Sequence, residues 1–323
     1  FRISVQRLLS PACARGSMGV SLEEQISPEI RKFAAEVGPT GPVTVAGGQT
    51  QWEVGGLPDP NVRKVVAPSG VWSHQPEEMT VRCGAGTTLI ELSEVLAQHS
   101  QMVPLDMAPN ATVGGVLAVG RSGIRRLRYG PMRDLVLQIR HVDHAGKIVT
   151  SGGPTVKNVS GYDLCRLLVG SLGKFGCIAE VILRCLPIPA ATKWLSGIAD
   201  PFEVYSKLYR PSSILWDGKR VWVCIEGVLS DVEAEAALLN LEEVEGPPAL
   251  PVGGRVALEP KSLKDLEVNG SNWIAEIGVG IVHGDIPIGG GQVSERNRSL
   301  MRDLEHRLDP TGRLNPGRQV VEA

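Results

Sequence analysis

A glycine-rich segment between residues 109 and 123 has the composition of a phosphate-binding loop. It reads Pro-Asn-Ala-Thr-Val-Gly-Gly-Val-Leu-Ala-Val-Gly-Arg-Ser-Gly, and its glycine pair, Gly114 and Gly115, comes directly before an apolar turn of helix. Glycine lacks a Cβ atom, so its backbone can approach a bulky anion, and free N–H groups at a helix start favour negative charge. The segment predicts a phosphate or pyrophosphate site, although glycine pairs also occur in ordinary turns.

A second glycine turn lies far upstream, directly after the strand-like run 43–45. It consists of Ala46, Gly47, Gly48, Gln49 and Thr50. Two such turns are able to hold one diphosphate from two sides. Neither turn matches the dinucleotide fingerprint G-x-G-x-x-G, and the sequence contains no G-x-x-x-x-G-K-[ST] motif, so Rossmann and P-loop interpretations are poor.

Composition narrows the class of protein. The chain has 323 residues, enough for two domains of about 100–200 residues each. A net charge of −2 and an aromatic content of 4% argue against a nucleic-acid partner. No run approaches the roughly 18 apolar residues of a membrane span, so we expect no transmembrane segment.

The cysteines predict no metal centre. They are scattered without a C-x-x-C pair, and most lie in apolar runs, which is typical of buried thiols in a reducing cytosol. An iron–sulfur cluster held by this chain is therefore not expected. The six cysteines are Cys13, Cys83, Cys165, Cys177, Cys185 and Cys224.

The first half of the chain predicts a mixed α and β domain. Residues 1–21 are expected to be disordered or non-native, and Thr88 with Glu91 forms a capping box that opens a helix to about Gln98. A proline pair, Pro187 and Pro189, marks a domain boundary. The other elements expected before it are a helix over 22–37, strands over 43–45, 63–67 and 79–83, a hairpin of 134–142 with 147–150, and a strand over 178–186.

The second half predicts a smaller α+β cap. Strand-like and helix-like patterns alternate there, around a loop over 246–254 that is rich in Gly and Pro. The expected strands are 192–198, 220–228 and 273–282, and the expected helices are 201–208, 230–241 and 294–307.

Two further segments carry a family resemblance. Lys157-Asn-Val-Ser-Gly-Tyr-Asp163 and Gly170-Ser-Leu-Gly-Lys-Phe-Gly176 follow the Ala-Thr-Val-Gly-Gly loop, and the chain closes with Asp309-Pro-Thr-Gly-Arg-Leu-Asn-Pro-Gly-Arg318. In this order the motifs resemble flavoproteins of the vanillyl-alcohol oxidase / p-cresol methylhydroxylase (PCMH-type) superfamily. Among these they are most similar to the FAD-binding E subunits of bacterial glycolate oxidases. The resemblance covers roughly 42–190 and the closing motif.

The resemblance implies an α+β fold with a two-part, PCMH-type FAD-binding domain. It places this domain at 22–190, a small cap or substrate domain at 191–305, and a tail at 306–323 that returns to the FAD domain. It implies that Ala46–Thr50 and Thr112–Gly115, with Val113 and Gly114 between them, hold the FAD pyrophosphate. It puts Gly176, Cys177 and Ile178 at the adenine, and Ser122 and Gly123 along the dinucleotide.

The resemblance also puts Lys157, Asn158 and Tyr162 near the flavin ring or its supporting shell. Lys157 and Tyr162 are the candidate catalytic residues, because an ammonium near the N1/C2 edge stabilises the anionic reduced ring. A solvated loop lysine and a packed tyrosine ring are the alternatives. The catalytic base stays unassigned.

Two departures from the family pattern matter. Covalent members carry a His in or near the first glycine loop, whereas Gln49 follows Gly48 here, so we expect non-covalent FAD. Related D subunits and D-lactate dehydrogenases carry H-x-G-D-G-N-x-H in their caps. This chain has only His283-Gly-Asp and no second His, so His283 is expected to be a strand-end residue rather than a metal ligand or base.

Arginines gather just after the second glycine segment, without an acid among them. This group is either an electropositive rim that attracts a small hydroxy acid, a docking patch for a partner subunit, or a solvated loop. Arg133 and Asp134 are expected to pair with each other. The arginines are Arg121, Arg125, Arg126, Arg128 and Arg133.

The expected function is an FAD-dependent oxidoreductase, or its FAD-binding subunit, that takes a hydride from the α-carbon of a small 2-hydroxy acid such as glycolate. Its electrons would pass to a partner, with an iron–sulfur subunit and a sister FAD subunit as the implied partners. The implied location is the cytoplasm, or the periphery of the inner membrane through those subunits. The alternatives are a non-catalytic flavin-binding or assembly subunit of a glycolate or lactate dehydrogenase, and a reductase that uses NADPH.

Overall fold

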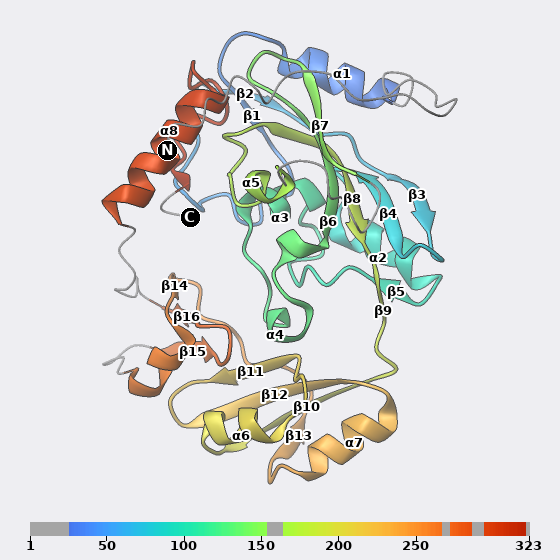
Figure 1. Ribbon diagram of the computed structural model, residues 1–323, viewed down its shortest axis with the longest axis vertical. Coiled ribbons are helices and arrows are strands. Elements are labelled where there is room, and N and C mark those ends of the chain that lie inside the picture. Colours follow the sequence, from blue (N-terminus) through green and yellow to red (C-terminus); the bar gives the residue numbers. More distant parts are fainter. Residues whose placement is uncertain (1–25, 154–163, 267–271, 286–293, 321–323) are drawn as a thin grey trace, which may run out of the picture.

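A computed structural model describes residues 26–153, 164–266, 272–285 and 294–320. These residues build two hydrophobic cores. One core uses residues between 30 and 185 together with Leu314, and the other uses residues between 195 and 282. Figure 1 shows the two parts end to end, with the first part above the second. The mixture of helices and sheets is the α+β class that the sequence predicts.

Helix α1 (Pro28–Val37) belongs to the first core and lies near a small parallel sheet of β1 (Val43–Val45) and β2 (Arg63–Val65). The Ser27 side chain accepts a hydrogen bond from the Ile30 amide, and proline occupies the first helical turn, where no backbone donor is needed. The helix therefore begins at Pro28, later than the expected residue 22.

An antiparallel five-stranded sheet forms the rest of this core, in the order β3-β4-β8-β6-β7. Its central strand β8 is buried over residues 177–183, which are apolar except for Glu180, and the Glu180 carboxylate pairs with Arg82 and Arg140. The capping box of Thr88 and Glu91 is present at the start of α2, as predicted. The strands are β3 (Val71–Gln75), β4 (Thr80–Gly84), β6 (Val136–Val142), β7 (Ile148–Gly152) and β8 (Cys177–Arg184), and α2 spans Leu89–Ala97.

Shorter elements connect these strands and close the site described below. A two-stranded sheet pairs β5 with β9 just before the chain enters the second core. The elements are β5 (Gln101–Met102), β9 (Leu186–Pro187), α3 (Val113–Val119), α4 (Arg126–Tyr129), α5 (Cys165–Leu168) and the 3-10 turn Met132–Leu135.

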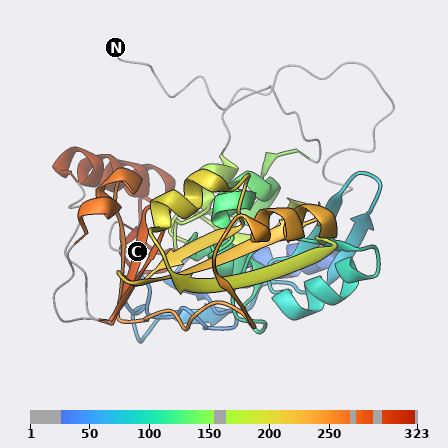
Figure 2. The same ribbon diagram turned by 90° about the horizontal axis from the view of Figure 1, so that it is seen from below.

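The second core includes side chains of a seven-stranded sheet, whose strand order is β13-β10-β12-β11-β15-β16-β14. Helices α6 (Pro201–Lys207) and α7 (Leu229–Ala237) contribute Val204 and Val232 to this core, and Figure 2 shows both helices along one side of the sheet. The strands are β10 (Ala191–Ile198), β11 (Ser213–Trp216), β12 (Arg220–Gly227), β13 (Glu242–Val244), β14 (Gly254–Ala257), β15 (Trp273–Glu276) and β16 (Ile281–Gly284).

The structure corrects one of the strands expected in the cap. The strand expected over 273–282 is an antiparallel hairpin of β15 and β16. Two glycines with positive φ, Gly278 and Gly280, turn the chain between them. Helix α8 (Glu295–Leu308) matches the helix expected over 294–307 to within one residue, and Ser294 caps its start. Its apolar residues Met301, Leu304 and Leu308 pack against the first core, although the expected domain bounds placed 294–305 in the cap.

The C-terminal segment after α8 lies beside β1. The Val43 amide donates to Arg313, the Asn315 amide donates to Val43, and Leu314 is fully buried in the first core. The buried guanidinium of Arg313 donates to the carbonyls of Val37, Thr40, Gly41 and His144. The closing motif is therefore a structural part of the first core.

Candidate cofactor site

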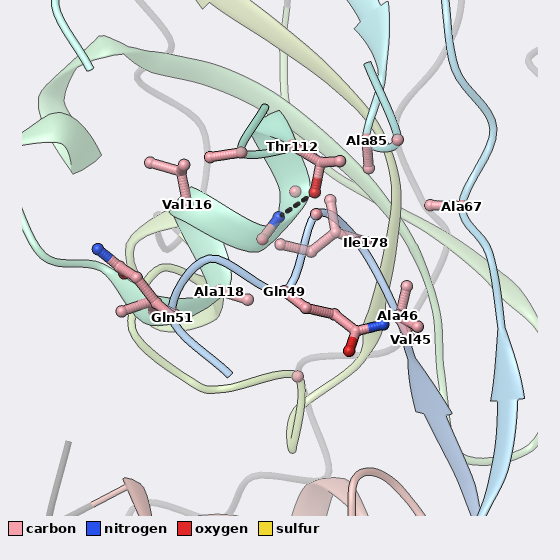
Figure 3. Close-up of a pocket in the computed structure, with 18 of the residues that line it drawn as sticks. Val45, Ala46, Gln49, Gln51, Ala67, Ala85, Thr112, Val116, Ala118 and Ile178 are labelled. Carbon is pink, nitrogen blue, oxygen red and sulfur yellow. Dashed lines mark hydrogen bonds between the residues drawn. The ribbon is translucent and has the colours of Figure 1, made fainter. Parts of the chain in front are cut away.

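A cavity of about 450 Å³ lies between the loop after β1, the start of α3 and the start of β8. This volume is within the range of small-molecule and cofactor pockets. Figure 3 shows Gln49 and Gln51 on the loop, with Thr112 at the start of α3 and Ile178 between them. The predicted residues that line the cavity are Ala46, Gly47, Gly48, Gln49, Thr50, Thr112, Gly114, Gly115, Gly176, Cys177 and Ile178.

The two glycine segments, far apart in sequence, are in contact. A Cβ atom on Gly47 would overlap the hydroxyl of Thr112, and one on Gly48 would overlap the carbonyl oxygen of Asn110. Only glycine allows the backbones to approach this closely. The two glycine turns therefore lie side by side, as the predicted diphosphate site requires.

The two segments differ in what they offer to an anion. The amides of Val113 and Gly114 donate to the carbonyls of Thr87 (2.9 Å) and Ala85 (2.7 Å), and the Gly115 amide donates to the Thr112 hydroxyl (3.3 Å). The expectation of free N–H groups at this helix start is therefore wrong. This segment supplies close packing instead.

The first loop supplies the unpaired donors. After Ala46, whose amide donates to Val65, the amides of Gly47, Gly48, Gln49 and Thr50 reach no acceptor in the described parts of the chain. Gln49 has a left-handed backbone, with φ of 55°. A left-handed residue within a loop is one arrangement in which successive N–H groups converge on an anion.

The turn that leads into β8 forms a third side of the cavity, beside the two glycine segments. A Cβ on Gly176 would overlap the ring of His141, which is buried and paired with Ile178 across the sheet. Burial raises the pKa of the Cys177 thiol to about 12 and lowers the pKa of His141 to about 4. At neutral pH both side chains are uncharged, so this wall adds no charge to the cavity.

The C-terminal segment adds lining residues that the sequence analysis gave no role. Asn315 donates to the Leu172 carbonyl, and the Thr44 hydroxyl donates to Asn315. The Arg318 guanidinium donates to the Val54 carbonyl at 2.7 Å and lies 4.7 Å from the centre of the Trp52 ring. The motif ending in Asn-Pro-Gly-Arg was recognised in the sequence, but its contact with the first loop required the fold.

Arg318 has no acidic partner in the described part of the protein. Arg318 is 6% exposed, and its Nε atom is buried without a hydrogen-bond partner among the residues that the structure describes. No Asp or Glu is among the described residues that line the cavity. Among the residues that the structure describes, the cavity therefore presents free amides and one guanidinium without opposing carboxylates, and this donor set fits a diphosphate.

Some predicted residues lie elsewhere. Val113 is fully buried at the start of α3. The Ser122 hydroxyl accepts from the Met132 amide, and Gly123 packs against Asp106, so the structure does not place Ser122 or Gly123 in the cavity lining. The remaining predicted residues, Lys157, Asn158 and Tyr162, fall outside the described residues.

The arginine segment makes different contacts from those expected. Arg125 pairs with Asp106 and, at 3.0 Å, with Glu226 of the cap, so it is not simply a solvated residue bonded to nearby carbonyls. Asp134 pairs with Arg166 at 2.7 Å rather than with its neighbour Arg133. These partners are distant in sequence, and no local pattern indicates them.

His283 lies in β16, and its Nε2 atom is 2.7 Å from Oε1 of Glu276. Across the parts of the chain that the structure describes, no three His, Cys, Asp or Glu side chains gather in a way that could hold a metal ion. None of the helices in those parts is both long enough and apolar enough to span a membrane.

Comparison with known proteins assigns the first domain. Residues 23–152 match the family model of an FAD binding domain. The chain is 35% identical over 187 residues to glycolate oxidase subunit GlcE of Escherichia coli (strain K12), covering 55% of this chain and 53% of GlcE. It is also 35% identical over 184 residues to D-lactate dehydrogenase of Archaeoglobus fulgidus, covering 56% of this chain and 41% of that protein. The matched region thus spans about half the length of these relatives or less.

The fold comparison extends beyond the first domain. A solved structure of alkyldihydroxyacetonephosphate synthase superposes with a TM-score of 0.62, at 16% identity, over 89% of this chain and 74% of that one. At this identity the likeness concerns the fold alone. The match of residues 23–152 to an FAD binding domain makes FAD the cofactor of the first domain.

Proposed function

We propose that the chain is an FAD-dependent oxidoreductase, or the FAD-binding subunit of one, that oxidises a small 2-hydroxy acid such as glycolate. The observation that carries this proposal is the meeting of two distant glycine segments around a cavity that, within the described residues, has unpaired amides and no lining carboxylate. Relatives named as glycolate oxidase subunit and D-lactate dehydrogenase support the substrate class. Bound FAD would supply the hydride acceptor for this chemistry.

The residues around the cavity have proposed roles in holding the cofactor. The amides from Gly47 to Thr50 and the Arg318 guanidinium bind the diphosphate, and the turn from Gly176 to Ile178 lies along the adenine side. Lys157 stays our candidate for the flavin edge. The remaining residues proposed to bind FAD are Ala46, Thr112, Val113, Gly114, Gly115, Ser122, Gly123 and Asn158.

We propose that FAD is held without a covalent bond. Gln49 occupies the place after the glycine pair where covalent family members carry a His in or near the loop. Cys177 lines the cavity, but a thiol with a pKa raised to about 12 is protonated at neutral pH and is a poor nucleophile. Release of yellow cofactor on mild acid precipitation, leaving colourless protein, is the expected result.

The proposed organisation has an FAD-binding domain at 22–190, a cap that begins at 191, and a tail from 306 that completes the first domain. The electrons would pass to a partner that contains iron and sulfur, and a sister FAD subunit is the second proposed partner. A cytoplasmic location, or one at the inner membrane through these partners, accompanies this proposal.

Anaerobic titration of the full chain tests the function. The chain is purified, saturated with FAD, freed of excess cofactor and mixed with glycolate, D-lactate or L-lactate, with acetate as the control that lacks the hydroxyl group. We expect the flavin absorption band to bleach with a hydroxy acid and to stay unchanged with acetate.

Three other outcomes would refute this function. A chain that stays colourless after saturation does not hold FAD. Yellow protein that no hydroxy acid bleaches, alone or with its co-purifying subunits, indicates the non-catalytic assembly subunit. Bleaching by NADPH and not by hydroxy acids indicates a reductase.

A further inference from the structure

Helix α4 belongs to the FAD-binding domain in sequence, but its side chains contact the cap. Leu127 packs against the second hydrophobic core, and the Arg128 guanidinium donates to the Arg210 carbonyl at 2.9 Å. The Tyr129 hydroxyl donates to the carboxylate of Glu226, in β12, at 3.0 Å. Figure 1 shows α4 directly above the cap strands. This short helix therefore joins the two domains through side-chain contacts, in addition to the chain connection through β9.

Arg125, the residue before α4, binds one carboxylate from each domain. Its guanidinium donates to Asp106 through Nε at 2.8 Å and to Glu226 through Nη1 at 3.0 Å. The side chains of Asp106 and Glu226 are only 12% and 2% exposed, and hydrogen bonds are stronger in such low-dielectric surroundings than in water. Arg125 therefore links the cap to the loop that contains Asp106, residues 103–110 of the FAD-binding domain.

The 103–110 loop also supports the loop after β1, which carries the unpaired amides. The side-chain amide of Gln51 donates to Sδ of Met107 at 3.1 Å. Gly48 lies against Asn110, since a Cβ atom at residue 48 would overlap the Asn110 carbonyl oxygen. Gln51, Gly48 and Asn110 all line the cavity. The position of the 103–110 loop therefore helps to set the position of the loop after β1.

Asp106 has a left-handed backbone, with φ of 47°. This conformation is costly for a residue other than glycine and persists where the surrounding contacts hold it. Three hydrogen bonds from Arg125, one from its backbone amide and two from its guanidinium, hold the Asp106 carboxylate. Without them the 103–110 loop is expected to relax, and the loop after β1 loses part of its support.

We propose that Arg125 is a positioning residue that couples the cap to the diphosphate-binding loop. Glu226 of the docked cap fixes the Arg125 guanidinium, and Arg125 fixes the 103–110 loop. That loop in turn keeps the amides of Gly47 to Thr50 in place for the diphosphate. Coupling between two sites is reciprocal, so the cap is held more firmly when FAD is bound. The inference rests on the proposed role of the Gly47 to Thr50 amides.

Fluorescence titration of the full-length apo-protein with FAD and with riboflavin tests the coupling. Glu226→Gln probes it from the cap, because Glu226 is not among the described residues that line the cavity. The affinity for FAD is expected to fall by about threefold to tenfold in Glu226→Gln, and further in Arg125→Met. Riboflavin has no phosphate, so its affinity is expected to stay close to that of the wild type. The ratio of the two affinities separates coupling from a general loss of folded protein, which weakens both ligands alike.

Glu243→Gln is the matched control. Glu243 pairs with Lys193 within the cap at 3.1 Å, and its side chain is 65% exposed. This variant is expected to bind FAD like the wild type. Arg125→Lys keeps the charge but loses the planar fork that donates to two carboxylates, so its FAD affinity is expected to lie between those of the wild type and Arg125→Met. If circular dichroism shows that Arg125→Met does not fold, Glu226→Gln and Arg125→Lys carry the test.

Hydrogen exchange measures the coupling in the other direction. In the wild type, the amides of β11 and β12 in the cap are expected to exchange more slowly when FAD is bound. In Glu226→Gln this difference is expected to become smaller, because the cap then has a weaker connection to Arg125.

An unchanged ratio of FAD to riboflavin affinity in Glu226→Gln and in the Arg125 variants would overturn the coupling, and so would an equal loss in Glu243→Gln. A wild type that binds FAD no more tightly than riboflavin would remove both the diphosphate role of the loop after β1 and this proposal. Failure of the proposed oxidation is a separate result, because these affinities are measured without a hydroxy acid.

Discussion

Replacement of Arg318 by Met is expected to weaken FAD binding by about tenfold to hundredfold. The Arg318 residue is 6% exposed, lines the cavity, and has no carboxylate partner in the described part of the protein. A hydrogen bond between a charged group and a phosphate contributes about 1.5–3 kcal/mol, and each 1.4 kcal/mol corresponds to about tenfold in affinity. Methionine keeps much of the side-chain volume beside Trp52 and removes the charge.

The same change has a smaller effect on stability. Arg318 donates one hydrogen bond to the Val54 carbonyl, at 2.7 Å. Its loss is expected to lower the free energy of unfolding by about 1 kcal/mol. The effect on the apo-protein is thus smaller than the effect on FAD binding, and chemical unfolding with and without FAD separates the two.

Fluorescence titration of the apo-protein with FAD and with riboflavin is the assay. Riboflavin has no phosphate, so its affinity is expected to change less than twofold in Arg318→Met, whereas that for FAD falls. Arg318→Lys is expected to be intermediate. Arg307→Met, in an exposed arginine of α8, is the control. Unchanged FAD affinity in Arg318→Met, or an equal loss for riboflavin, would refute the reasoning.

Three further changes test other parts of the structure. Gly48→Ala puts a Cβ atom onto the carbonyl oxygen of Asn110, and this variant is expected to purify without FAD. Gly246→Ala, at a glycine with open space around it, is the control and is expected to keep FAD. Equal FAD content in the two variants would contradict the argument that the two glycine segments approach closely. Burial lowers the pKa of His141 to about 4, below its ordinary value of about 6.5. The unfolded chain therefore binds the proton first, and the free energy of unfolding falls by up to about 3 kcal/mol as pH drops from 6.5 to 4; urea unfolding of His141→Gln should show a shallower decline. Glu226→Gln removes one charge from the buried pair with Arg125 and is expected to lower stability by about 2 kcal/mol, which a thermal scan of the FAD-loaded chain would measure against wild type.

Local signals in the sequence predicted the local structure. The Thr88–Glu91 capping box defines where α2 begins, because it satisfies backbone donors within one turn. The strand predicted over 178–186 is likewise present, as β8 over Cys177–Arg184. The hairpin of β15 and β16 was missed because its two short strands, joined by glycines, resemble one continuous apolar run.

Site residues that depend on distant partners were not predictable. Arg125 and Glu226 are about a hundred positions apart, and only the contact between the cap and the α4 segment brings them together. The expected pair of Arg133 and Asp134 failed because neighbouring side chains do not face each other in a 3-10 turn, whereas Arg166 lies within reach of Asp134.

The sequence by itself determined the glycine turns, the order of the flavoprotein motifs and the helix caps, because each of these is encoded in residues that are neighbours along the chain. The tertiary structure alone decided which amides stay free for the cofactor. The amides of Val113 and Gly114 at the start of α3 donate to the carbonyls of Thr87 and Ala85, whereas the amides of the loop after β1 find no acceptor in the described parts of the chain. The tertiary structure also decided that Arg318 lines the same cavity, because the pairing of the C-terminal segment with β1 brings the Arg318 guanidinium to the loop.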